Sequence, residues 1–183
     1  MACRTILFAL VLAAPAWAEC PAAPDISAQL DALVDEARTA PNERAGQDVS
    51  GRMWQQWLRA PDAQAQSWLE EGMERRRVFD FAGAIAAFDA LVAYCPDYAE
   101  GYNQRAFVHF LREDHDAALV DLDKTLSLQP RHVGALTGKG LTLFALDRVA
   151  EGQDAIRAAV ELNPWVSERR LLDVAPAPDG IEL

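Results

Sequence analysis

Side chains able to perform acid–base or metal chemistry are few in this chain. It has three histidines, His109, His115 and His132. His109 and Glu113 lie four residues apart, about one helical turn, but a closed zinc site takes four ligands. His115 falls in the polar segment 112–116, which is typical of a solvated turn. The sequence lacks a glycine-rich phosphate loop, a serine elbow and a cysteine–histidine motif. We therefore predict no enzyme activity, no catalytic residues, no metal and no cofactor.

Two tryptophans suggest a different kind of site. Trp54 and Trp57 are three residues apart, so they are neighbours on one helix face, where tryptophans usually fill a core. The alternative is an enzyme or small-ligand site, formed where an N-terminal helix pair meets the rest of the chain and using Trp54, Trp57 or His109. Polar groups converging in a closed pocket would favour this alternative, whereas an open apolar groove would favour protein binding.

The first 18 residues have the pattern of an export signal. Arg4 is followed by the apolar run 6–14, by Pro15 and by Ala-Trp-Ala at 16–18, with small residues at the two positions that a signal peptidase reads. The apolar run is much shorter than the roughly 20 residues that a membrane-spanning helix needs. We predict a signal peptide over 1–18, export most simply to the periplasm, and no stable membrane insertion after its removal.

Export would change the chemistry of the cysteines. Cys3 would leave with the signal peptide, so the mature chain would keep Cys20 and Cys95. In an oxidising compartment an isolated pair of cysteines tends to form a disulfide. We expect a Cys20–Cys95 bridge that holds the proline-rich leader against the fold. The alternative is a buried thiol at Cys95 and an exposed one at Cys20.

The elements that position these residues follow a repeat of 34 residues. Pro96, Pro130 and Pro164 are spaced by that period, and the windows 65–98, 99–132 and 133–166 align on it. The fourth, eighth and twenty-fourth positions of the three windows alternate large with small residues: Trp68, Tyr102, Leu136; Gly72, Ala106, Gly140; and Phe88, Leu122, Ile156. The pattern resembles the tetratricopeptide repeat (TPR) over residues 65–166.

That resemblance implies an all-α fold, a right-handed α-solenoid of three helix pairs, with turns near Phe79-Asp80, Glu113-Asp114 and Asp147-Arg148. Residues 62–166 would hold the three repeats, and 167–183 a short capping segment and a flexible tail. Residues 19–61 would hold the leader and an atypical helix pair, which starts near Asp25 and ends near Ala60. We expect this pair to cover the open end of the stack.

The resemblance also implies a binding surface. In the family, the first helix of each repeat lines a concave groove through its second, fifth, ninth, twelfth and thirteenth positions. These positions are Gln66, Leu69, Met73, Arg76, Arg77; Glu100, Asn103, Phe107, Phe110, Leu111; and Gly134, Thr137, Leu141, Phe144, Ala145. They give an apolar groove with a basic corner at Arg76-Arg77, suited to an extended peptide or a helix. The alternative is that terminal helices fill the groove.

Two departures from the family pattern matter. Some relatives clamp a peptide carboxylate through Lys and Asn, but the matching positions here carry Leu69, Met73 and Gln104, so no such clamp is expected. The seventh position, usually leucine, is Glu71, Arg105 and Lys139. Glu71 and Arg105 could pair along the stack; otherwise each of the three stays a solvated charge on an apolar stem.

Composition narrows the class of partner. The formal net charge is −11, which argues against nucleic acid and anionic membrane surfaces. Apolar residues make up 51% of the chain, so wholesale disorder is not expected. The sequence therefore predicts a non-catalytic protein–protein interaction module, a scaffold, adaptor or chaperone, that binds an unidentified envelope protein or peptide.

Overall fold

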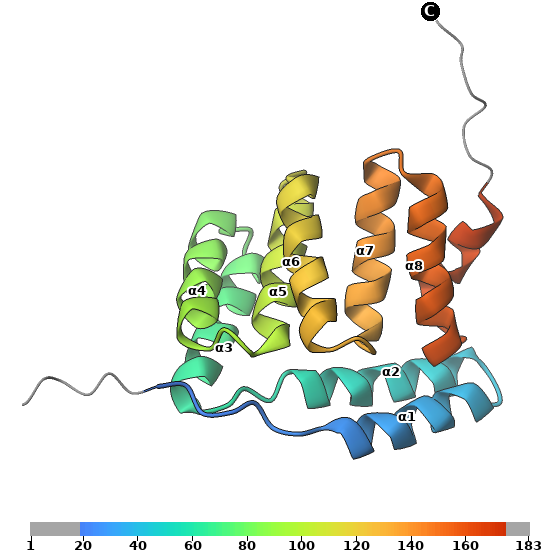
Figure 1. Ribbon diagram of the computed structural model, residues 1–183, viewed down its shortest axis with the longest axis horizontal. Coiled ribbons are helices and arrows are strands. Elements are labelled where there is room, and N and C mark those ends of the chain that lie inside the picture. The colour runs from blue at the N-terminus through green and yellow to red at the C-terminus, as the bar shows by residue number, and fades with distance from the viewer. Residues whose placement is uncertain (1–18, 175–183) are drawn as a thin grey trace, which may run out of the picture.

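The computed structural model describes residues 19–174 of the chain, and this part is all-helical (Figure 1). It contains eight α-helices and a terminal 3-10 helix, with no strand in the described range. The predicted signal peptide and the end of the predicted tail lie outside the described residues. No helix among those described is both long enough and apolar enough to span a bilayer.

Six helices form three antiparallel pairs that stand side by side (Figure 1). They are α3 (Ala63–Arg77) with α4 (Phe81–Tyr94), α5 (Ala99–Leu111) with α6 (His115–Leu128), and α7 (Val133–Ala145) with α8 (Val149–Leu162). Each pair has an apolar face that only its neighbour can bury, which is why such units stack. The predicted all-α solenoid is confirmed.

Each pair reverses direction through one residue in the left-handed region. Phe79, Glu113 and Asp147 have φ values of 63°, 62° and 59°. Backbone hydrogen bonds close the turns directly after them; for example, the Asp80 N–H donates to the Arg75 carbonyl oxygen at 2.9 Å. The left-handed conformation disfavours side chains with a Cβ, so the tight turn itself holds these residues there. The turns fall where the repeat pattern predicts them.

Small residues let the two helices of a pair approach closely. A Cβ atom added to Gly72 would lie 2.4 Å from the Phe88 ring, and one added to Gly140 would lie 2.4 Å from Ile156 Cδ1. Phe88 and Ile156 are fully buried. The alternation of large and small residues in the repeat is therefore a packing rule: the bulky side chain of the second helix occupies the space above a glycine of the first.

The N-terminal pair, α1 (Ser27–Thr39) and α2 (Glu43–Trp57), does not cover the open end of the stack. It runs along the base, beneath the loops that end each repeat (Figure 1). The predicted cap position was wrong, because amphipathic spacing indicates a buried face without naming its partner. The second helix also ends at Trp57, three residues before the predicted Ala60.

Contacts with the base reach all three repeats. Tyr98 Oη donates to the Trp57 carbonyl oxygen at 2.7 Å, below the first repeat. The Trp57 ring stacks on His132 with centroids 3.9 Å apart, below the second. Trp165 Nε1 donates to the Ala37 carbonyl oxygen at 3.1 Å, below the third. The N-terminal pair therefore buries its apolar side on the stack as a whole.

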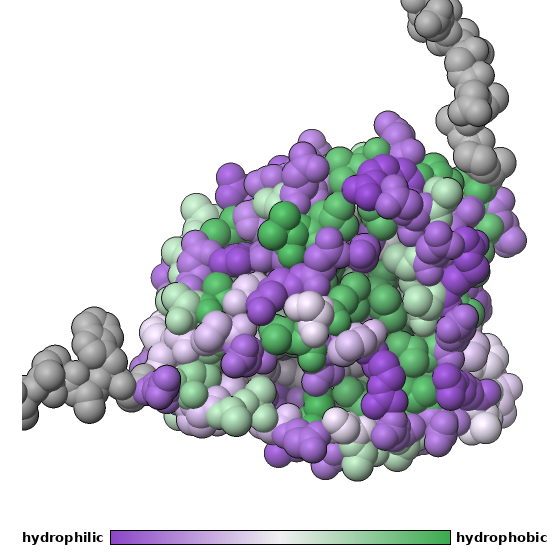
Figure 2. All heavy atoms as spheres, viewed as in Figure 1, coloured by the Kyte–Doolittle hydropathy of each residue, from purple (hydrophilic) through white to green (hydrophobic). Residues whose placement is uncertain are grey.

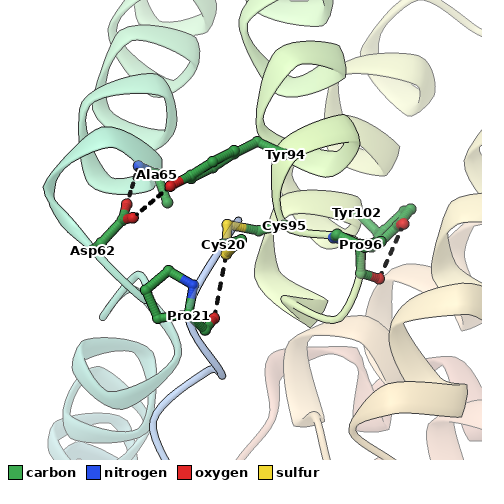
Figure 3. The surroundings of a disulfide bond; sticks show 8 residues. All are labelled: Cys20, Pro21, Asp62, Ala65, Tyr94, Cys95, Pro96 and Tyr102. Carbon is green, nitrogen blue, oxygen red and sulfur yellow. Dashed lines mark hydrogen bonds between the residues drawn. A yellow bond between two sulfur atoms is a disulfide. The ribbon is translucent and has the colours of Figure 1, made fainter. Parts of the chain in front are cut away.

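A disulfide joins the leader to the first repeat (Figure 3). Cys20 and Cys95 are bonded, with their Cα atoms 5.2 Å apart, and Cys95 is buried. Nearby, the Asp62 carboxylate caps α3 by accepting from the Ala65 N–H and from Tyr94 Oη, each at 2.8 Å. The leader is thus covalently attached beside the start of α3 and the end of α4.

The charged residues at repeat position seven do not pair with one another. Glu71 accepts from Arg75 on its own helix at 2.9 Å. Arg105 instead binds two carboxylates, Asp121 on α6 and Asp89 on α4, at 2.6–2.7 Å. The Glu71–Arg105 pair, one of the two alternatives, does not form, because Arg75 lies one turn from Glu71 and needs no second helix to reach it.

Candidate functional site

A cavity of about 370 Å³ opens between the first helices of the repeats and the end of α2. Its walls are mostly apolar, and we call it the groove pocket. It is lined by Trp54, Leu58, Met73, Arg76, Asn103, Gln104, Ala106, Phe107, Phe110, Leu122, Gly134, Thr137, Gly138, Leu141 and Thr142. Figure 2 shows the face of the molecule that is seen in Figure 1. On this face, hydrophobic residues gather toward the α6–α8 half among hydrophilic ones.

Many of the residues expected to face the groove do line this pocket. They come from all three repeats: Met73, Arg76, Asn103, Phe107, Phe110, Gly134, Thr137 and Leu141. Phe107 is 47% exposed although it is a large aromatic residue. The first helices of the three repeats therefore converge on one shared apolar surface.

Other residues of the expected set lie elsewhere. Leu69 is fully buried in the core and Glu100 is only 1% exposed. Gln66 accepts from the Ala60 N–H at 3.0 Å, and Arg77 pairs with Glu74 on an exposed surface. Leu111 is exposed outside the pocket, and Phe144 packs on Gly152 of the neighbouring helix. The repeat positions predict which face of each first helix points toward the groove. The N-terminal pair, which contributes Trp54 and Leu58 to the wall, determines how much of that face lines the pocket.

Trp54 and Leu58 form a wall of the pocket. From the sequence, Trp54 is a candidate only for the alternative small-ligand site, and Leu58 is not a candidate site residue. The Trp54 ring lies against Gly134, where an added Cβ would come within 2.7 Å of it. Trp57, in contrast, is buried core, as its spacing suggested. The two alternatives for the groove therefore combine: the N-terminal pair does not fill the groove, but it closes one side of it.

Beneath the pocket lies a buried polar network centred on Glu100. His132 Nε2 is 2.8 Å from Glu100 Oε2, and the Asn103 and Gln104 side-chain amides also donate to the Glu100 carboxylate. His132 Nδ1 accepts from the Ala135 N–H at 3.1 Å, so the proton shared with Glu100 resides on Nε2. Both residues are almost fully buried, and neither lines the groove pocket. The network fixes α5 to the start of α7.

Arg76 is the charged residue of the groove pocket. Its guanidinium lies 4.7 Å from the Phe107 ring centroid and donates to Gln104. Burial lowers the pKa of Arg76, an effect that the Glu100 charge opposes. Within residues 19–174 it has no carboxylate oxygen within 4.0 Å, whereas Arg77 next to it is paired with Glu74. Arg76 therefore presents a positive charge to an apolar cavity.

The described part of the chain has few side chains arranged to bind a metal or to perform catalysis. In residues 19–174 no group of three or more His, Cys, Asp and Glu side chains is arranged to hold a metal ion. His109 Nδ1 lies 3.4 Å from Asp114 rather than facing the pocket, and His115 begins α6 beside Phe110. The arrangement offers a binding surface without a nucleophile and base in contact.

Comparison with known proteins agrees with the repeat pattern, although no family model matches the chain. It is 31% identical over 110 residues to a TPR repeat-containing protein of Rhizobium etli, covering 60% of this chain and 47% of that protein. It is 35% identical over 71 residues to the tetratricopeptide repeat protein 36 homolog of Nematostella vectensis, covering 39% of each. The chain thus spans less than half the length of these relatives.

Solved structures share the fold. The TPR2B domain of yeast Sti1, in its pHsp70 complex, superposes with a TM-score of 0.56 at 24% identity, covering 60% of this chain and 91% of that domain. MamA from Desulfovibrio magneticus superposes with a TM-score of 0.52 at 19% identity, covering 78% of each. The 34-residue period, the stacked helix pairs and these likenesses together show that the chain has the fold of tetratricopeptide repeat proteins.

Proposed function

We propose that this protein is a non-catalytic interaction module that binds a peptide or helix of a partner protein in the groove pocket. One observation carries the proposal: the apolar residues of three helices converge on an unfilled cavity, with Phe107 exposed at its edge. Exposed apolar surface of this kind is typical of protein-binding grooves. Structural neighbours support it by their own complexes, which hold an Hsp70 peptide in Sti1 and the HSP90 peptide SRMEEVD in RPAP3.

We further propose that the module works in the cell envelope, most simply in the periplasm, as a scaffold, adaptor or chaperone for another envelope protein. The apolar run at residues 6–14 and the following small residues support export. The Cys20–Cys95 disulfide also suits an oxidising compartment. Fractionation of cells that express the full chain would test the location; a full-length, reduced protein in the cytosol would contradict it.

A binding site for a small molecule is the second candidate. It is favoured by Trp54, which brings the N-terminal pair into the wall of the groove pocket. The polar groups best suited to catalysis, Glu100 and His132, are buried in their own hydrogen bonds and do not line the cavity. An open groove that lacks these polar groups therefore favours a protein partner over a substrate.

Site-specific photo-crosslinking tests the main proposal. A photoreactive phenylalanine analogue at Phe107 samples the groove, and the same analogue at Val120 samples an exposed position on α6 outside the pocket. Both positions carry large exposed apolar residues, so they are matched. We expect discrete protein adducts in the envelope fraction from position 107 and few from position 120. Equal adducts from both positions, or none from position 107, would contradict the proposal.

A further inference from the structure

We propose that the groove pocket recognises an acidic, apolar-anchored peptide: a large apolar side chain enters the cavity and a neighbouring carboxylate of the same segment binds Arg76. This inference rests on the proposed function and names the chemistry of its partner. It concerns a subsite made jointly by the repeats and by α2, which contributes Trp54 and Leu58 to the wall.

The cavity sets the apolar part of the ligand. Its volume of about 370 Å³ is near the lower end of the range for pockets that hold drug-sized molecules, roughly 300–1,000 Å³. Trp54, Met73, Phe110 and Leu141 lie around it without a charged group of their own. Such a space suits one or two bulky apolar side chains and disfavours a polar segment, whose hydrogen bonds to water it would not replace.

Arg76 determines the charged part of the ligand. Among the described residues, it is the charged side chain that lines the pocket, and burial lowers its pKa because the cation has lost water. Its hydrogen bond to Gln104 is an uncharged contact, and Phe107 covers one face of the guanidinium. The Glu100 charge acts on Arg76 from behind Gln104, so a carboxylate in the groove would add a counter-charge in direct contact and accept a charge-assisted hydrogen bond.

The subsite is held in shape before any ligand arrives. Trp57 is stacked on His132 and accepts the Tyr98 hydroxyl hydrogen bond through its carbonyl oxygen, which fixes the end of α2. Trp54 meets the Trp57 ring edge-on, with centroids 5.5 Å apart. On the other side, Glu100 holds Gln104, which in turn receives Arg76. A preformed wall and a positioned cation reduce the entropy lost on binding.

The test is a random hexapeptide library displayed on phage and selected on the disulfide-bonded chain 19–183. We expect enriched peptides to place Asp or Glu within two positions of a large apolar residue. One enriched peptide is then synthesised, together with versions in which its acidic residue becomes the amide and its apolar residue becomes alanine. Affinities of each are measured for the wild type, Arg76→Gln, Arg76→Lys and Arg77→Gln.

Arg76→Gln and the peptide amide change should each weaken binding roughly tenfold or more, and together no more than either alone. Arg76→Lys should retain part of the affinity, and the wild-type affinity should fall with added salt. Arg77→Gln, which removes an equal charge from a residue outside the pocket, should change the affinity less than about twofold. Circular dichroism spectra of the variants should match that of the wild type.

Other results separate this inference from the proposed function. Thr137→Trp fills the cavity and should abolish binding of any groove peptide. If Thr137→Trp abolishes binding while Arg76→Gln has no effect, or if enriched peptides lack acidic residues, the acidic-peptide inference is wrong and groove binding stands. If no peptide is enriched, both are overturned. Binding of decanoate through Arg76 without any enriched peptide would identify a small-molecule site instead.

Discussion

At the level of single residues, the core depends on large side chains seated over small ones. Phe88 is fully buried over Gly72. Replacing Phe88 with alanine should lower the free energy of unfolding by roughly 3–5 kcal/mol, because a cavity replaces the ring. Urea denaturation followed by circular dichroism measures the change. Val120→Ala, at a position 69% exposed, is the control and should have little effect. Equal stability of Phe88→Ala and the wild type would exclude the assigned core role.

His132 connects the buried Glu100 network to the start of α7 and to Trp57. His132→Ala would remove one hydrogen bond from the buried Glu100 carboxylate, which keeps those from Asn103 and Gln104, and would leave the Ala135 N–H without a partner. It would also remove the ring stacked on Trp57. Burying unsatisfied polar groups costs about 1–3 kcal/mol each, so we expect a loss of at least about 2 kcal/mol. The quantity to measure is the free energy of unfolding at neutral pH.

His115→Ala is the matched control for this change. His115 Nδ1 has no hydrogen-bond partner in the described part of the chain, and the residue is half-buried beside Phe110 at the start of α6. Its replacement breaks no side-chain hydrogen bond, so it should lower the free energy of unfolding by about 1 kcal/mol at most. Similar losses from the two substitutions would mean that the Glu100 network contributes little.

At the level of the helices, the repeat pattern predicts α3 to α8 well. Phe79, Glu113 and Asp147 turn the chain where the 34-residue period places them, because local packing of each pair repeats with the sequence. The place of α1 and α2 could not be predicted, since an apolar face at Leu30 or Met53 indicates burial without identifying the surface that buries it.

The unpredicted place of α2 also explains why the sequence predicts only part of the candidate site. Phe107 and Phe110 line the pocket as expected, because one helix face follows from the repeat offsets alone. Glu100 shares that expected face but is buried in hydrogen bonds with Asn103, Gln104 and His132. Trp54 joins the pocket because of where α2 lies. The helical spacing of an atypical element indicates which of its faces is buried but not the surface on which that face packs.

Helix capping by Asp62 makes a prediction about acid stability. Hydrogen bonds from the Ala65 N–H and from the Tyr94 hydroxyl lower the pKa of Asp62 below its ordinary value of 3.8. The folded state thus favours the ionised carboxylate, and its stabilising effect is complete above pH 3.8 and lost as the pH falls through the lowered folded pKa. Asp62→Ala should therefore lower the Tm at pH 7, with a difference from wild type that shrinks in acid.

Asp62→Asn separates the charge from the hydrogen bond. Asparagine is also a good N-cap, so this variant should lose less stability than Asp62→Ala at pH 7. It should also lack the pH dependence that the carboxylate contributes. A Tm difference between Asp62→Ala and wild type that grows on acidification would contradict the assigned sign.

At the level of the whole molecule, the disulfide joins the leader to the first repeat across 75 residues of sequence. Closing a loop of this length restricts the unfolded chain by an amount worth about 4 kcal/mol at most. We expect a reducing agent to lower the Tm of the wild type and to leave that of Cys20→Ser unchanged. Mass spectrometry of unreduced protein from an oxidising compartment checks the bond itself; two free thiols would contradict it.

The N-terminal pair also limits the number of repeats in the stack. Along α2, Gly46 meets Trp165 at one end of the array, while Trp57 meets Tyr98 and His132 toward the other. A helix of 15 residues is about 22 Å long, and this length cannot stretch. Duplicating a repeat, the usual way in which solenoids grow, would move Trp165 away from Gly46 by the width of one helix pair. The N-terminal pair at the base therefore favours a stack with a fixed number of repeats, in contrast to solenoids that gain or lose units freely.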